Sequence, residues 1–340
     1  MDAVTIDYAV ARSAGRAALR PGPELSRAEA SEVVEGLRAA ARASVAHVAE
    51  VTGLTSPPSQ DDMLVVDRAT WLDANLEMVE SLLAAAGASG AEGLRGRLAG
   101  LGNGVQVGGA LGLLSGRILG QFVPFGRQRL LLVAPNIAAM ERRLGVDGTD
   151  FRLWVCLHEQ THRLQFVQAP WLGEYLVRQL AHLLDEPEDS SATPSRPSSA
   201  IEALLTPAQR IVFNQITAVM SLLEGYADVM MDRVGPDVVP SVASIRERFN
   251  AHRQRRGLVK VVNKLMGLDL KLAQYRDGAV FCRAVIERVG VAGLNAVYES
   301  SGMLPTLDEI HAPEVWLARA FPTVEVGAGD VSRPEGTSSP

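Results

Sequence analysis

The segment from Phe151 to Phe166, FRLWVCLHEQTHRLQF, constrains this chain more than any other. It carries His158, Glu159 and His162 in an otherwise mostly apolar run. On an α-helix, residues four positions apart lie on one face about one turn apart, so both imidazoles can reach one metal ion at about 2 Å. The intervening glutamate projects to the side of the pair, where it can deprotonate a metal-bound water.

A chance occurrence of this short pattern is the alternative. Six histidines in 340 residues make such an accident on the order of one in a hundred. Polar side chains clustered within an apolar helix cost several kcal/mol unless they have partners, and a metal ion would supply one. The sequence therefore predicts a zinc site (Zn2+) on His158 and His162.

Composition sets the class of protein. An apolar content of 47% and a charged content of 21% are typical of a globular protein. A length of 340 residues suffices for one large or two modest domains. A net charge of −6 gives no general basis for nucleic-acid binding. The two cysteines, Cys156 and Cys282, exclude a disulfide scaffold and make the cytoplasm the expected location.

Targeting and membrane segments are not predicted. The first residues carry Asp2 and Asp7 and lack the basic start and long apolar run of a secretory signal. The longest mostly apolar stretch, 101–122, is rich in glycine and interrupted by Gln106 and Arg117. We expect a closely packed core segment there, with a membrane span as the alternative.

Helical periodicity predicts a mainly α chain with a small β component. Ser26 with Glu29 predicts a capped helix start, and Thr206 before Pro207 predicts another. The short apolar run Arg129–Pro135 is the best strand. Helices are expected over 1–20, 26–51, 67–86, 91–99 (ending at Gly100), 136–144, from Thr149 or Asp150 to Pro170, 171–184, 207–233, 241–256, 259–289, 294–301 and 313–321.

The chain is expected to have three regions. Residues 1–125 form an N-terminal helical region, and residues 126–322 form the region that carries the histidine motif. Within the latter, the polar segment 185–200, rich in proline and serine, is expected to be a mobile loop. Residues 323–340 are expected to be a disordered tail.

A tetrahedral zinc with two histidines needs a third protein ligand and an open position for water. Glu224 and Asp228 lie four residues apart on an otherwise apolar helix, where two carboxylates repel each other unless a positive group is near. Glu224 is the predicted ligand, and Asp228 is predicted to accept the free N–H of His158. Gly225 would let the two motif helices approach closely. The alternatives are an exposed carboxylate pair, or a third ligand from His182, His252, His311 or Glu174.

These motifs resemble the gluzincin branch of zinc metallopeptidases. His158-Glu-Gln-Thr-His162 followed by Glu224-x-x-x-Asp228 matches its two motifs, although 62 positions separate His162 from Glu224 where the branch commonly has a few tens. More of the chain resembles an actinobacterial family of zincin-like metallopeptidases of unknown function. Members carry labels of hydrolase, or of an association with deazaflavin coenzyme biosynthesis that names no chemistry. The resembling stretches are RPGP (20–23), VTGL (51–54), LLLVAPNI (130–137), LWVCLHEQTHRLQF (153–166), GLDLKLAQY (267–275) and LPTLDEI (304–310).

The resemblance implies a zincin-like core of two motif-bearing helices and hydrolysis of peptide or amide bonds in a peptide or protein substrate. Glu159 would act as the general base. Tyr275, with His252 second, is the suggested donor to the oxyanion, and ordinary helix packing is the alternative for Tyr275. The strand at 129–133 either pairs with an extended substrate or is a core strand.

A non-catalytic accessory or scaffold protein with a structural or occluded zinc site is the rival interpretation. Glu159 favours the catalytic interpretation, because a structural zinc site does not need a carboxylate at that position. The sequence leaves open the substrate, the choice between endo- and exopeptidase, and the oligomeric state.

Overall fold

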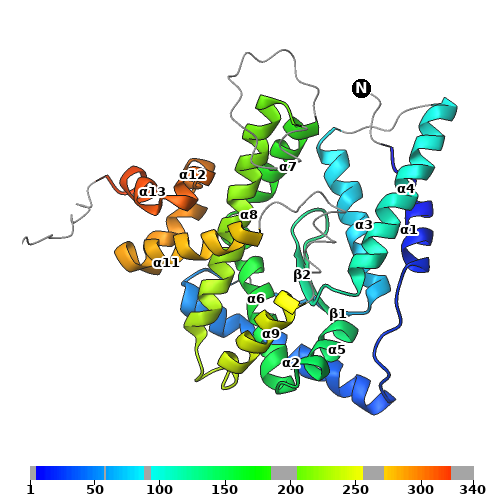
Figure 1. Ribbon diagram of the computed structural model, residues 1–340, viewed down its shortest axis with the longest axis horizontal. Coiled ribbons are helices and arrows are strands. Elements are labelled where there is room, and N and C mark those ends of the chain that lie inside the picture. Colours follow the sequence, from blue (N-terminus) through cyan, green and yellow to red (C-terminus); the bar gives the residue numbers. More distant parts are fainter. Residues whose placement is uncertain (1–4, 57–58, 88–92, 185–204, 256–271, 323–340) are drawn as a thin grey trace, which may run out of the picture.

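Helices make up most of the molecule, and a small three-stranded sheet lies among them (Figure 1). The computed structural model describes residues 5–56, 59–87, 93–184, 205–255 and 272–322. The expected mainly α architecture with a small β component is confirmed. The elements are α1 (Tyr8–Ala17), α2 (Arg27–Thr52), β1 (Met63–Val66), α3 (Arg68–Ala85), α4 (Gly93–Ser115), β2 (Gly120–Val123), β3 (Arg129–Val133), α5 (Ala134–Leu144), α6 (Gly148–Gln168), α7 (Trp171–Leu184), α8 (Pro207–Val234), α9 (Val242–Arg255), α11 (Leu272–Leu294), two 3-10 turns (Asn295–Tyr298 and Ser301–Met303), α12 (Leu307–His311) and α13 (Pro313–Ala320).

Local capping signals set several helix boundaries. The predicted capping box is present at the start of α2, where the Ser26 hydroxyl accepts from the Glu29 N–H and the Glu29 carboxylate accepts from the Ser26 N–H. Thr206 caps α8 in the same way. The predicted start of α6 was wrong: the cap is Asp147, whose carboxylate accepts from the Asp150 N–H, so the helix begins earlier than expected.

Helix α4 departs most from the sequence expectation, because it continues through the predicted stop at Gly100. Three of its glycines, Gly104, Gly108 and Gly112, lie directly against α1 and its ends. A Cβ atom on Gly108 would stand 1.9 Å from the Ala11 carbonyl oxygen, and one on Gly104 would stand 2.6 Å from the Asp7 carbonyl oxygen. This contact between helices outweighs the low helix propensity of glycine. The expected close packing is therefore found, and among the described helices none is long and apolar enough to cross a membrane.

The sheet has the order β1-β3-β2, with β3 parallel to β1 and antiparallel to β2. The predicted strand Arg129–Val133 is thus the central strand. Because both its edges are occupied, it has no backbone groups left to pair with a substrate, and the core-strand interpretation holds. Strand β2 lies next to α6. The sheet combines strands from both sides of the boundary expected at residue 125, while 185–200 and 323–340 fall outside the described residues.

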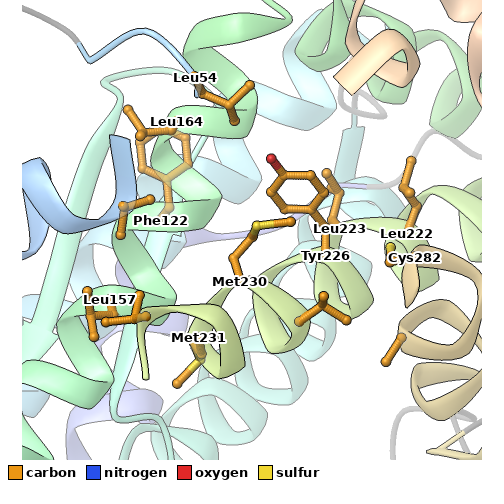
Figure 2. Packing of buried hydrophobic residues seen from close by; sticks show 14 of the residues in the cluster. Leu54, Phe122, Leu157, Leu164, Leu222, Leu223, Tyr226, Met230, Met231 and Cys282 are labelled. Carbon is orange, nitrogen blue, oxygen red and sulfur yellow. The ribbon is translucent and has the colours of Figure 1, made fainter. Parts of the chain in front are cut away.

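The main core lies between α2, α6, α8 and α11. Figure 2 shows a part of it, with residues of α6 and α8. Gly225 of α8 fits against α11 rather than against the other motif helix: a Cβ atom there would lie 2.2 Å from the Gly278 carbonyl carbon. The close approach that Gly225 permits is therefore between α8 and α11. Buried side chains that join the two motif helices include Leu157 and Leu164 from α6 and Leu222, Leu223, Tyr226 and Met230 from α8.

Candidate metal centre

The two motif helices bring three potential ligands together. His158 and His162 project from α6 and Glu224 projects from α8, with one ligand atom of each within 4.8 Å of the others. The two histidine Nε2 atoms are 3.1 Å apart. The Glu224 carboxylate oxygens lie 3.6 Å from Nε2 of His158 and 3.7 Å from Nε2 of His162.

This donor set fits a zinc ion. Two imidazole nitrogens and one carboxylate oxygen converge from two helices, which is the three-ligand set of zinc sites that keep an open coordination position. The sequence predicted these three residues as ligands from two four-residue spacings, His158 to His162 and Glu224 to Asp228, on mostly apolar helices. The structure joins them across 62 positions of chain.

Gln165 orients His162, and sequence analysis missed it. Its Oε1 lies 2.9 Å from Nδ1 of His162, while its Nε2 donates to the Leu223 carbonyl and the Tyr298 hydroxyl. The fully buried amide thus links the ligand to α8 and to the first 3-10 turn. Helical spacing could have predicted this contact, because position 165 follows His162 by three residues and lies on the same helix face.

Asp228 lies beside the candidate metal site. It does not accept the N–H of His158, which the sequence analysis had predicted. Nδ1 of His158 lies 3.2 Å from Sδ of Met231. The Asp228 carboxylate instead accepts from Arg246 at 3.0 Å, and Arg283 is 3.6 Å away. These two arginines come from α9 and α11, which the sequence could not place near α8.

Glu159 occupies a buried position between the metal ligands and β2. The backbone N–H of Phe122 hydrogen-bonds its carboxylate. A Cβ atom on Gly120 would lie 2.5 Å from Cγ of Glu159, so only glycine lets β2 approach the side chain this closely. Burial raises the pKa of Glu159 to about 7, opposed by the positive charge on His158. A carboxyl group with this pKa can take and return a proton near neutral pH.

The two histidines differ electrostatically. Burial lowers the pKa of His162, which favours the neutral imidazole that a metal requires. Burial also pushes the pKa of His158 down, but the adjacent Glu224 carboxylate, aided by Glu159 and Asp228, raises it to about 9. The carboxylates around His158 therefore favour its protonated form.

A cavity of about 280 Å³ opens onto His158, Glu159 and Glu224 and is called the active-site pocket below. Tyr275 belongs to α11, but its side chain lies outside the described residues. His252, near the end of α9, does not line the cavity. The remaining walls are the turn between α4 and β2 (Arg117, Ile118, Leu119), the first residue of β2 (Gly120), α6 (Trp154, Val155), α8 (Asp228, Met231) and α9 (Arg246, Phe249, Asn250).

The mainly helical fold and its paired motif helices define a zincin-like protein. Over residues 6–317 the chain matches the family of zincin-like metallopeptidases, and it belongs to that family. It is also similar to a protein of Chloroflexus aurantiacus whose crystal structure is described as that of a candidate hydrolase with a novel fold. Identity is 34%, the match covers 92% of this chain and 98% of that chain, and the TM-score is 0.70. No curated protein matches the chain.

Proposed function

We propose that this protein is a zinc-dependent hydrolase of peptide or amide bonds. The observation that carries the proposal is the convergence of His158, His162 and Glu224 beside a buried Glu159, with His158, Glu159 and Glu224 lining a cavity. The zincin-like family and the candidate hydrolase from Chloroflexus aurantiacus support a hydrolase.

The roles follow from the positions. His158, His162 and Glu224 would hold the zinc ion. When bound, zinc supplies a Lewis acid and lowers the pKa of a coordinated water towards ~7. Glu159 takes a proton from the attacking water as the new carbon–oxygen bond forms, and gives it to the amine nitrogen as the carbon–nitrogen bond breaks. Asp228 would line the pocket beside these ligands, where Arg246 holds its carboxylate.

A donor for the developing oxyanion must also face the pocket. Tyr275 and His252 are the donors suggested by sequence. The amide of Asn250 lines the pocket, and within the described part of the chain it has no hydrogen-bond partner, so it offers a further N–H donor.

The rival function is a non-catalytic accessory protein with a structural or occluded zinc site. The cavity that reaches both His158 and Glu159 favours catalysis, because a structural zinc site is closed by four protein ligands.

One variant separates the two functions. We expect the wild-type protein to bind one zinc ion and to cleave members of a broad peptide library, and the Glu159→Gln variant to bind zinc equally well without cleaving. Metal content is measured by atomic emission and cleavage by mass spectrometry. Stoichiometric zinc with no cleavage by the wild-type protein would favour the accessory function, and a protein that binds no zinc would exclude both.

A further inference from the structure

The charged groups around the active-site pocket are paired, with one exception. Arg246 forms ion pairs with Asp228 and Asp232 at 3.0 and 2.8 Å. Arg283 pairs with the same two carboxylates at 3.6 and 3.1 Å. These two arginines and two aspartates therefore balance each other in charge.

The remaining charge sits on Arg117. In the zinc-bound protein, Glu224 and Glu159 would together offset the two positive charges of the ion. Arg117 is an exposed residue that lines the same pocket from the turn between α4 and β2, and it forms no ion pair with any residue that the structure describes. The pocket therefore has one uncompensated positive charge.

We propose that Arg117 binds a carboxylate of the substrate, and so selects peptides with a carboxylate near the scissile bond. The proposal rests on the proposed hydrolytic function. A guanidinium group presents a planar fork of N–H donors that matches a carboxylate. One uncompensated charge also matches the single charge of a carboxylate better than the nearly double charge of a phosphate monoester.

The size of the pocket places this carboxylate close to the reacting bond. Its volume of about 280 Å³ lies just below the usual range for ligand pockets, roughly 300–1,000 Å³. Arg117, His158 and Glu159 line this one small pocket together, so a group bound by Arg117 would lie near the reacting bond. The carboxylate would thus belong to the residue at the scissile bond or to its neighbour, either as a chain terminus or as an acidic side chain.

The test compares matched substrates with zinc-loaded protein. Short N-acetylated peptides are prepared as free acids, as C-terminal amides, and as amides with aspartate at the last position. We expect kcat/KM for the free acid to exceed that for the plain amide by about tenfold or more, as expected for one hydrogen bond to a charged group. If the aspartate amide is cleaved at the rate of the free acid, Arg117 accepts a side-chain carboxylate. If the aspartate amide is cleaved as slowly as the plain amide, Arg117 requires the carboxylate of the chain terminus.

Variants assign the preference to Arg117. Arg117→Gln should reduce the ratio of the two kcat/KM values to about one, and Arg117→Lys should keep part of it. Arg127→Gln is the matched control, because Arg127 is an exposed arginine at the other end of β2 and does not line the pocket. An equal kcat/KM for acid and amide in the wild type, or an unchanged ratio in Arg117→Gln, would overturn the proposal.

Binding provides a second measurement that does not depend on turnover. In zinc-loaded Glu159→Gln protein, calorimetry should show tighter binding of the free acid than of the amide, and Arg117→Gln should remove the difference. Equal binding would overturn the role of Arg117 even where hydrolysis is seen. Conversely, tighter binding of the acid without hydrolysis by the wild type would refute the hydrolase and leave Arg117 as an anion-binding residue.

Discussion

Oε1 of Gln165 lies 2.9 Å from Nδ1 of His162, and this contact leaves Nε2 as the ring nitrogen that would bind a metal ion. The amide oxygen accepts from Nδ1–H, so the lone pair of the neutral ring is left on Nε2. The amide nitrogen is held in turn by the Leu223 carbonyl and the Tyr298 hydroxyl. The orientation of this ligand therefore depends on a buried network of three segments of the chain.

Gln165→Leu should weaken zinc binding about 10–100-fold, which is the usual effect of losing a group that orients a ligand. Zinc affinity is measured by competition with a chromophoric chelator. Gln168→Leu is the control, since Gln168 lies near the end of the same helix and is exposed. Equal zinc affinities for the two variants would show that Gln165 does not orient His162.

Glu224→Gln should reduce zinc affinity by more than the roughly 100-fold expected from loss of an orienting group, because it removes a ligand. The comparison is Glu174→Gln, which alters a highly exposed carboxylate on α7 that the sequence had left as a rival ligand. Metal content after dialysis distinguishes them. Retention of stoichiometric zinc by Glu224→Gln would mean that another residue completes the site.

The helical spacing of His158 and His162, and of Glu224 and Asp228, made the candidate ligand group predictable, because these side chains lie on helices that are otherwise mostly apolar. Periodicity within a helix also contained the signal for Gln165. It carried no information on Arg246 or Asn250, because these residues come from α9, and only the tertiary fold places α9 beside the pocket. For the same reason the predicted partner of Asp228 was wrong.

The fold shows the same division between local and tertiary causes. The caps at Ser26 and Thr206 were predictable because their hydrogen bonds join residues three positions apart. The continuation of α4 through Gly100 was not predictable from the sequence. The helix continues because its glycines pack against the backbone of α1, about 90 residues away in sequence.

Two adjacent glycines of α4 test that explanation. Gly108→Ala should destabilise the protein by more than about 2 kcal/mol, because the added Cβ would meet the Ala11 carbonyl at 1.9 Å and force α1 away. Gly109→Ala should stabilise it by up to about 1 kcal/mol, because nothing lies within 4 Å of the new atom and alanine favours the helix. Denaturant titration measures both, and equal effects would contradict the proposed role of the α1 contact.

The pH dependence of stability should reveal the ion pair between Glu309 and Arg319, whose atoms approach to 2.7 Å. Burial alone would raise the pKa of Glu309, but hydrogen bonds from Arg319 and from the Thr306 N–H outweigh it and lower the pKa below its ordinary 4.5. A lowered pKa in the folded state means that the ionised group stabilises the fold above about pH 4.5, and that this contribution is lost as pH falls through the folded-state pKa.

Glu309→Gln keeps the side-chain length and supplies an amide oxygen that can accept the capping hydrogen bond from the Thr306 N–H, but it removes the charge. It should therefore cost about 1 kcal/mol at neutral pH and progressively less in acid, until the two proteins are equally stable at a pH below the folded-state pKa. Glu314→Gln, on exposed α13 surface, should show little difference at any pH. Urea titrations of the three proteins between neutral and acid pH measure the effect, and a cost for Glu309→Gln that does not shrink in acid would mean that packing, rather than charge, is what the substitution removes.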